Sequence, residues 1–337
     1  MKEAYLYKKL SLEKVQCRNC AHYCVLSSKE RGKCGVRENI EGKLYALNYE
    51  KLVACNIDPI EKKPFFHFLP GSQSLSVAAV GCNFSCLNCQ NYDISQGLKR
   101  AKEIPGQKVS PQQIVELALK NKLPSISYTY TEPTVFLEYA LDTMKLAKNA
   151  GLKNTFVSNG FMTLESAKMV IPYLDANNID IKGFSDDFYR RNCGALLQPV
   201  LDTAKLMKKL GVWVEITTLV IPTLSDSEEM FREIARFIYK ELGSETPWHL
   251  SQFSGAISWK LQNVPNTPIE TLKVAFRIGK EEGLKYVYTG NVPGLSSEDT
   301  FCPKCGMLVI DREVYFVKRY DKFGKCPKCG GILNIID

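Results

Sequence analysis

The sequence predicts an α/β protein whose main part is a partial (β/α)6 barrel of the TIM type. A cysteine-rich region is expected before this barrel, and a rubredoxin-like or zinc ribbon after it. Three observations lead to this prediction. Strand-like apolar segments alternate with helical segments through the middle of the chain, no glycine-rich dinucleotide turn appears, and eleven of the thirteen cysteines fall into three groups.

Six strands are expected in the barrel, and a seventh segment is expected to extend or flank the sheet. The six span 74–81, 125–131, 154–160, 177–183, 212–221 and 248–253, and the seventh spans 285–292. Helical patterns at 135–151 and 198–211 each end in glycine, a common C-terminal stop. Strands joined through such helices form right-handed units with a parallel sheet.

The sequence also indicates where several helices begin. Ser110, Ser225 and Thr267 are predicted N-caps, because each is followed three residues later by Gln or Glu. The chain as a whole divides into an N-terminal cysteine-rich region at 1–73, the barrel at 74–300 and a ribbon at 301–337.

Composition excludes several classes of protein. The first residues contain no apolar stretch typical of a signal peptide, and no run of about 18 apolar residues occurs, so a cytoplasmic protein without a membrane span is expected. Thirteen cysteines without a secretory signal do not predict a disulfide framework. The net charge of +8 is dispersed, which is typical of a solvated surface and leaves a mild preference for an anionic partner. No nucleic-acid-binding signature accompanies it.

The terminal cysteines are predicted to form a structural metal site. Two CPKCG knuckles supply Cys302, Cys305, Cys326 and Cys329. Four thiolates from two such turns suit tetrahedral Zn²⁺ or a single rubredoxin-like iron. A ribbon of this size buries too little apolar surface to fold without its metal.

The N-terminal cysteines leave two interpretations open. Cys17, Cys20, Cys24 and Cys34 could hold a zinc ion that staples the N-terminal extension, or an auxiliary [4Fe–4S] cluster. His22 lies within this run and is interpreted as a bystander.

The third group has three members only. Cys82, Cys86 and Cys89 follow the first barrel strand at spacing C-x3-C-x2-C, with no fourth cysteine or histidine nearby. Cys55 is a spare thiol, but it precedes the strand. Three ligands indicate a cluster with one open iron, and zinc with a bound water is the alternative.

This spacing after a strand resembles the signature of the radical S-adenosylmethionine (SAM) superfamily. The resemblance implies that the amine and carboxylate of SAM complete the open iron of a [4Fe–4S] cluster. It implies an electron donor such as ferredoxin or flavodoxin, reductive cleavage of SAM, and a 5′-deoxyadenosyl radical that abstracts hydrogen from a substrate.

Further motifs resemble those of the superfamily. "YTEP" resembles the motif that receives the SAM amino group, which implies Glu132 and Thr131 as contacts. "VSNG" implies that Ser158 and Asn159 contact the methionyl or ribose part, although Asn-Gly is also a simple turn.

Two later segments extend the resemblance. "DIK" resembles a segment of pyruvate formate-lyase activating enzyme and implies Asp180 and Lys182 beside the SAM carboxylate and the substrate. "LVIPTLSDSEE" resembles the loop that supports adenine and implies Val220 and Ile221.

Over nearly the whole chain the sequence resembles AmmeMemoRadiSam-system radical SAM enzymes, including the segment 283–294. Two departures stand out. Asn88 occupies a position that is usually aromatic, which puts adenine stacking in doubt. After the sixth strand, Ser254, Gly255 and Ile257 stand where relatives carry a different stretch, so the substrate could differ or be more apolar.

The substrate is left open between several alternatives. The enzyme could be a glycyl-radical activase, modify a protein or RNA, or form C–C bonds on lipid chains. A non-enzymatic metal-binding scaffold is the alternative from another class. His67 and His249 are interpreted as packing or substrate-facing residues, and Cys193 as a buried structural cysteine.

Overall fold

The centre of the protein is a nine-stranded sheet, seen in a computed structural model that describes residues 1–292, 296–313 and 315–337. The strand order is β15-β14-β13-β12-β11-β10-β8-β7-β9. The strands are β7 Lys51–Pro59, β8 Gln73–Ala79, β9 Gln107–Lys108, β10 Ser125–Tyr128, β11 Lys153–Ser158, β12 Ala176–Asp180, β13 Trp213–Val220, β14 Trp248–Gln252 and β15 Val287–Gly290. Neighbours from β8 to β15 pair in parallel, whereas β7 pairs with β8 and β9 in antiparallel fashion.

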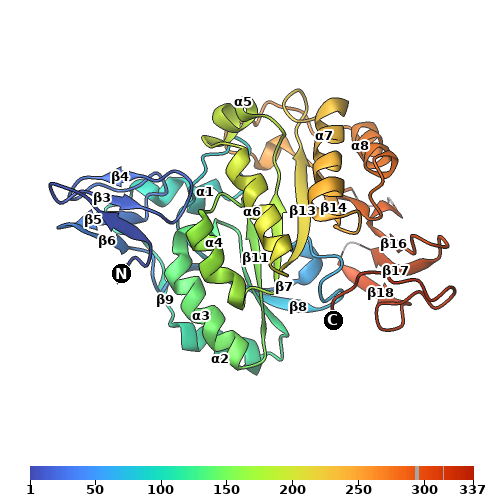
Figure 1. Ribbon diagram of the computed structural model, residues 1–337, viewed down its shortest axis with the longest axis horizontal. Coiled ribbons are helices and arrows are strands. Elements are labelled where there is room, and N and C mark those ends of the chain that lie inside the picture. Colours follow the sequence, from blue (N-terminus) through green and yellow to red (C-terminus); the bar gives the residue numbers. More distant parts are fainter. Residues whose placement is uncertain (293–295, 314) are drawn as a thin grey trace.

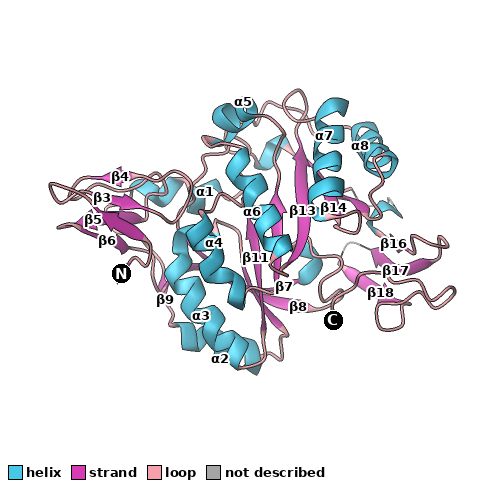
Figure 2. Ribbon diagram, viewed as in Figure 1, coloured by secondary structure: helices cyan, strands magenta, loops and turns pink. Residues whose placement is uncertain are grey.

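Helices cover one face of this sheet (Figure 1, Figure 2). They are α1 Tyr92–Ser95, α2 Pro111–Lys120, α3 Leu137–Asn149, α4 Leu164–Val170, α5 Asp186–Phe188, α6 Gln198–Lys209, α7 Glu228–Phe237 and α8 Ile269–Glu281. π-Helical turns at Tyr189–Cys193 and Ile238–Leu242 continue α5 and α7.

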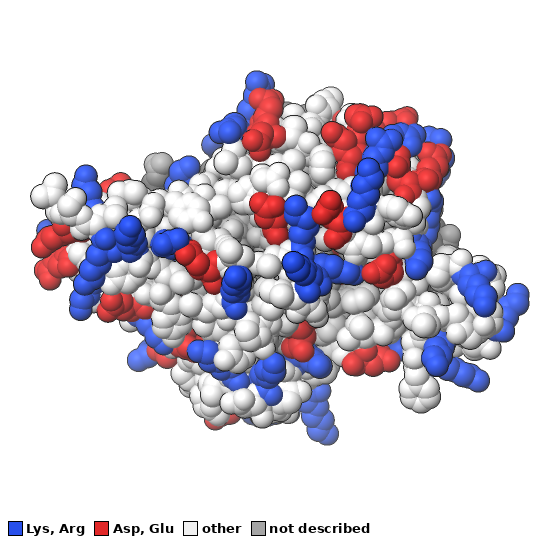
Figure 3. Space-filling model, viewed as in Figure 1, with Lys and Arg blue, Asp and Glu red and all other residues white. Residues whose placement is uncertain are grey.

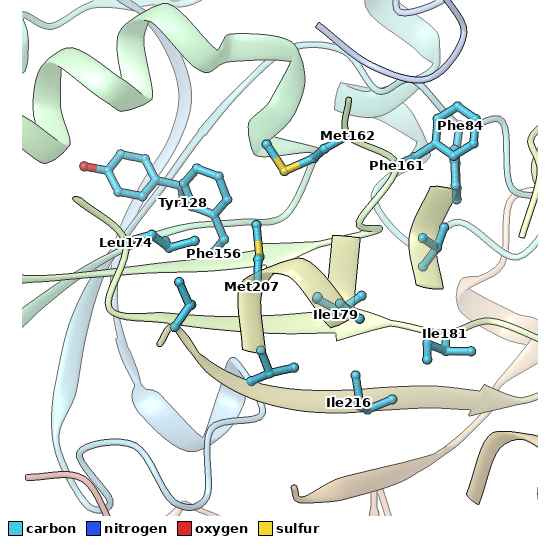
Figure 4. Close-up of a cluster of buried hydrophobic side chains, with 14 of the residues drawn as sticks. Phe84, Tyr128, Phe156, Phe161, Met162, Leu174, Ile179, Ile181, Met207 and Ile216 are labelled. Atoms are coloured by element: carbon cyan, nitrogen blue, oxygen red, sulfur yellow. The ribbon is translucent and has the colours of Figure 1, made fainter. Parts of the chain in front are cut away.

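The apolar core lies between the sheet and these helices. Tyr128 of β10 packs edge-on against Phe156 of β11, with ring centroids 5.6 Å apart, and Ile179 and Ile216 continue this layer on β12 and β13 (Figure 4). Met207 of α6 is buried against it. Burial of this apolar layer is the main force that holds helices and sheet together.

The opposite face of the sheet, called here the inner face, carries many polar side chains, whereas Val157, Ala176 and Trp213 on this face pack against Ile60, Phe65 and Phe68. Ser127 Oγ lies 2.6 Å from Ser74 Oγ and 2.7 Å from Thr155 Oγ1, which links β8, β10 and β11. Thr217 of β13 donates to Asn178 Oδ1 of β12 at 2.8 Å. A sheet whose inner face is satisfied by such side chains can line a polar chamber without exposing apolar surface.

Two small sheets form the N-terminal part of the chain, at the left of Figure 1. One contains β1 Lys2–Glu3, β6 Lys43–Ala46 and β5 Arg37–Ile40, and the other β2 Tyr7–Lys9, β3 Val15–Cys17 and β4 Val25–Leu26. A buried ion pair joins this region to the main body, since Arg37 Nη2 lies 2.6 Å from Glu138 Oε2 of α3.

The C-terminal ribbon lies at the opposite end of the molecule (Figure 1). Its strands are β16 Thr300–Phe301, β17 Leu308–Glu313 and β18 Phe316–Arg319, paired antiparallel. The ribbon contacts the loop after β7, because Ile336 N donates to His67 O at 2.8 Å and Arg312 Nη2 donates to Phe66 O at 2.7 Å.

The predicted α/β class and parallel sheet are confirmed, and each predicted strand contains an observed strand or matches it within a few residues. β7 belongs to the predicted 1–73 region but pairs with β8, so the sheet begins before residue 74. Residues 293–294 of the 283–294 segment lie outside the described residues. None of the described helices is long and apolar enough to cross a membrane.

Two of the three predicted N-caps are wrong. Ser110 caps α2 through the predicted capping box. Ser225 instead accepts from Ile221 N and donates to Leu219 O, and Ser227 caps α7. Thr267 donates to Val220 O at 2.5 Å, so α8 begins after Pro268 without a side-chain cap. In both cases the hydroxyl is hydrogen-bonded to backbone groups at the end of β13 or directly after it, not to the first turn of the helix.

Candidate functional site

The loop that follows β8 carries three cysteines at the carboxyl edge of the sheet. Cys86 is buried, and Cys82 and Cys89 are half-buried. Phe84 N points at Cys82 Sγ at 3.4 Å, and Ser95 Oγ lies 3.2 Å from Cys89 Sγ. Donors of this kind stabilise thiolates that ligate a metal.

Spacing between thiols distinguishes this loop from the ribbon. In the ribbon, Cys302 Sγ and Cys329 Sγ are 3.6 Å apart, as are Cys305 Sγ and Cys326 Sγ. Four thiolates around one tetrahedral zinc lie about 3.8 Å apart, so the ribbon fits a single ion. Among the described residues, no other group of three cysteines has its Sγ atoms within 4.8 Å of one another. The thiols of Cys82, Cys86 and Cys89 are therefore not gathered around one point as the ribbon thiols are.

A buried carboxylate lies beside the cysteine loop. Glu132, after β10, accepts from Ser158 Oγ at 2.8 Å and from Asn159 N at 2.8 Å, and Thr134 donates to it through its backbone and hydroxyl. Burial raises the pKa of Glu132, and these hydrogen bonds partly offset that rise. Asn159 Nδ2 in turn donates to Asn83 Oδ1 at 2.8 Å and lies 3.9 Å from Cys82 Sγ.

The turn that holds Ser158 and Asn159 requires glycine at its next position. Gly160 has φ +67°, and a Cβ there would meet Ile179 at 3.0 Å. Gly160 N donates to Ser158 Oγ at 3.0 Å, which orients the hydroxyl toward Glu132. The turn therefore directs the Ser158 hydroxyl to Glu132 and the Asn159 amide to the cysteine loop.

Asp180 and Lys182 lie at the carboxyl end of β12 and form an ion pair of 2.7 Å. Burial alone would lower the pKa of Lys182, but Asp180 and the thiols of Cys86 and Cys193 hold it well above its usual value. The Cys193 thiol hydrogen-bonds Cys86, which raises the pKa of Cys86 and lowers that of Cys193. The Asp180–Lys182 ion pair thus lies beside the cysteine loop.

The remaining predicted contacts lie around this centre. Thr131 Oγ1 donates to Ala79 O at 2.7 Å, which anchors the turn before Glu132 to the end of β8. Val220 and Ile221 are buried where β13 ends, and their backbone groups are bonded to Thr267 and Ser225.

The comparisons with known proteins agree with this geometry. The Radical SAM superfamily matches residues 76–238. An uncharacterized protein of Methanocaldococcus jannaschii is 48% identical over 339 residues, which cover all of both chains. The chain belongs to the radical SAM superfamily.

Other matches are more distant. A pyruvate formate-lyase-activating enzyme of Clostridium pasteurianum is 25% identical over 164 residues, 47% of this chain and 66% of that protein. A radical SAM methyltransferase structure from Sphaerobacter thermophilus has a TM-score of 0.51 at 14% identity, covering 72% of this chain and 71% of that one. Streptococcus suis SuiB bound to its precursor peptide SuiA has a TM-score of 0.50 at 14% identity, covering 69% and 51%. These two structures are similar in fold alone.

The N-terminal cysteines lie directly against the loop that carries Cys82, Cys86 and Cys89, called here the radical SAM loop. Cys17, Cys20, Cys24 and Cys34 line one hollow. A Cβ on Gly81, which has φ +107°, would meet Cys34 O at 2.9 Å. His22 Nε2 lies 2.8 Å from Asn83 O, so this histidine links the two cysteine loops rather than facing solvent.

Residues that sequence reasoning missed complete the radical SAM loop. Lys99 donates to Phe84 O at 3.0 Å; burial lowers its pKa, while thiols of both cysteine loops act in the opposite direction. Trp259 N donates to Cys89 O at 3.1 Å and Lys260 N to Leu87 O at 2.8 Å. The segment after β14 therefore folds back onto the loop, and no spacing signal in the sequence pointed to it.

The unusual Asn88 has a partner. Asn192 Nδ2 donates to Asn88 Oδ1 at 2.9 Å, and Ser85 N and Leu87 N donate to the carbonyls of Cys193 and Asn192. The π-helical turn at Tyr189–Cys193 is thus hydrogen-bonded to the radical SAM loop. Cys193 is fully buried within this support.

Proposed function

We propose that this protein is a radical SAM enzyme that cleaves SAM reductively and abstracts a hydrogen atom from a polar substrate. The observation that carries the proposal is the convergence of the Cys82–Cys89 loop, the Glu132 carboxylate and the Ser158–Asn159 turn at one edge of the sheet. Three thiolates leave an iron open, and the neighbouring carboxylate suits the ammonium group of a bound amino acid.

The reaction balances with one external electron. A low-potential donor such as ferredoxin or flavodoxin supplies it, the C5′–S bond of SAM breaks, and methionine and a 5′-deoxyadenosyl radical result. That radical takes one hydrogen atom from the substrate, which gives 5′-deoxyadenosine and a substrate radical.

The surrounding residues would position the reactants. Glu132 would accept from the SAM ammonium, with Thr131 holding its turn. Ser158 and Asn159 would contact the methionyl or ribose part. Asp180 and Lys182 would face the SAM carboxylate and the substrate, and Val220 and Ile221 would support adenine.

We assign the N-terminal cysteines to a second [4Fe–4S] cluster rather than zinc. Their Sγ atoms are more widely spaced than the four of the ribbon, which favours cluster corners over a single ion. The Arg37 guanidinium, which is paired with Glu138, also lies near Cys17 and Cys34. The ribbon would hold zinc or one iron.

Among substrates, the polar inner face favours a polar molecule or protein segment over a lipid chain. The similarity to a pyruvate formate-lyase-activating enzyme covers 47% of this chain, so activation of a glycyl-radical protein is the second candidate.

The decisive test is anaerobic incubation of the reduced, iron-loaded protein with SAM. We expect 5′-deoxyadenosine and methionine in equal amounts, and their loss in Cys86→Ser. Cys55→Ser is the matched control, because Cys55 is exposed on β7 and outside the three groups. A metal-binding scaffold would instead tolerate Cys86→Ser and give no SAM cleavage in any form.

A further inference from the structure

A second cavity lies between the inner face of the sheet and the ribbon. Its volume is about 350 Å³, and His249, Ser251, Phe66, Glu61, Glu298 and Tyr315 are among its lining residues. These residues come from β14, from the loop after β7, from the segment before β16 and from the turn between β17 and β18. The cavity belongs to neither the radical SAM loop nor the N-terminal cysteines.

The His249 side chain in the cavity lining belongs to a buried Glu–His pair. Glu215 accepts from the backbone N–H groups of Phe66 and His67 and from Trp213 Nε1, all at 3.0 Å, and lies 2.6 Å from His249 Nε2. Burial would raise the pKa of Glu215, but His249 and the other donors hold it below its usual value. An ionised carboxylate only accepts, so Nε2 of His249 carries the proton. Nδ1 is left without a hydrogen bond from any described residue.

Two carboxylates also line the cavity. Glu61 is 5% exposed, and its Oε2 has no hydrogen-bond partner among the described residues. Glu298 also lines the cavity. Arg312 Nη1 donates to the Glu298 carbonyl and to Thr300, and its Nη2 donates to the Phe66 carbonyl. Its Nε is one donor without a partner among the described residues, whereas Lys62 bonds to Asp58. Acceptors therefore outnumber uncommitted donors around the cavity.

Strand register connects this cavity to the radical SAM site. Asp180 of β12 pairs with Thr217 of β13, and Thr217 pairs with His249 of β14. Paired residues of neighbouring parallel strands lie about 4.8 Å apart with side chains on the same face. His249 is thus in the same row as Asp180, two strands away.

We infer that this cavity binds the substrate and that it recognises a protonated amine on that substrate. Glu61 and Glu298 would neutralise the ammonium group, His249 Nδ1 would accept one of its hydrogens, and the Tyr315 ring on the rim would favour a cation. This inference rests on the proposed function for the reaction, but amine binding is measurable without turnover.

The test uses the iron-loaded, SAM-bound protein and radiolabelled putrescine in anaerobic equilibrium dialysis. 1,4-Butanediol serves as the uncharged analogue and octanol as the apolar one. We expect putrescine to bind at least tenfold more tightly than either, and Glu298→Gln to weaken its binding about fivefold. Glu116→Gln, an exposed change on α2, is the matched control and leaves binding unchanged.

The pH dependence provides an independent readout. The pKa of Glu298 is raised to about 7. Burial is the main cause, Arg312 lowers the pKa, and Asp299 raises it. Glu61, Lys62 and His249 also face the cavity. As pH rises from about 6 to about 8, Glu298 loses its proton while putrescine keeps its charge, so binding tightens. Burial also raises the pKa of Glu61, which acts in the same direction, so Glu298→Gln should reduce this slope and leave the part that belongs to Glu61.

The outcomes separate the two proposals. Equal binding of putrescine and butanediol, tighter binding of octanol, or an unchanged slope in Glu298→Gln would overturn the amine pocket. SAM cleavage measured on the same preparation tests the proposed function alone. A preparation that cleaves SAM but ignores putrescine refutes only the inference about the substrate.

Discussion

At the scale of single residues, Gly81 determines how closely the two cysteine loops approach. Its φ is +107°, and a Cβ at this position would lie 2.8 Å from Val36, which leaves no room for a side chain. Gly81→Ala should lower the free energy of unfolding by about 3 kcal/mol and reduce the iron content. Gly151→Ala is the control, because Gly151 also has positive φ but has open space, and should cost about 1 kcal/mol. Equal effects in urea unfolding would contradict the role of the contact.

Glu132 provides the second prediction at this scale. The described hydrogen bonds to the Glu132 carboxylate are donated by backbone N–H and side-chain O–H groups of the protein. Glu132→Gln would therefore place an amide NH2 against one of these donors. We expect SAM to bind at least tenfold more weakly, about 1.4 kcal/mol or more, with iron content unchanged. Anaerobic calorimetry measures this, and SAM affinity equal to that of the unaltered protein would rule out the proposed contact.

At the scale of elements, His67 joins the ribbon to the sheet. Its Nδ1 lies 3.1 Å from Leu333 O, and its Nε2 lies 2.7 Å from Tyr288 Oη. This bonding identifies it as a packing residue with a neutral ring, and burial lowers its pKa to about 4.

The pKa of His67 predicts a pH-dependent stability. An unfolded histidine takes up its proton near pH 6.5, whereas the folded one resists until about pH 4. The contribution of His67 to stability is therefore fully present above pH 6.5. The free energy of unfolding falls by roughly 3 kcal/mol as pH falls from 6.5 to about 4. In His67→Gln the loss between these pH values should shrink, as urea unfolding at a series of pH values would measure. An unchanged slope would assign the acid sensitivity to other groups.

The same scale shows what could be predicted from sequence. The strands were predicted because apolar segments alternate with helices, and glycines mark the turns. The caps at Ser225 and Thr267 failed because their hydroxyls bond to the loop after β13, a tertiary contact with no local signal. Glu215 and His249 meet only through the register of β13 with β14, so their pairing required the sheet itself.

At the scale of the whole molecule, the two cysteine-bearing appendages lie at opposite ends of the barrel (Figure 1). Charges of both signs are interspersed over the face in Figure 3, in agreement with the dispersed net charge of +8. The metal of one appendage should therefore be removable without loss of the metal of the other. We expect about eight irons with the ribbon metal in addition, and Cys24→Ser should remove about four irons while leaving the ribbon metal in place. Retention of all iron in Cys24→Ser, measured by metal and sulfide analysis, would refute the second cluster.

The ribbon supplies the last prediction. Cys326→Ser removes one of four thiolates and should unfold residues 300–337 locally, because its small apolar cluster holds only Val309 and Leu333 besides the cysteines as fully buried members. Limited proteolysis should then cleave this segment while the iron content of the barrel is retained. A protease-resistant ribbon without metal would contradict the prediction.

The attachment of the ribbon through Arg312 and His67 has a consequence for the order of events in the cell. Because Tyr315 of the ribbon lines the proposed amine pocket, a chain whose ribbon lacks metal would, under the proposed function, still cleave SAM but could not retain the molecule that should receive the radical. Supply of the ribbon metal would then act as a maturation checkpoint, and its failure would appear as futile consumption of SAM.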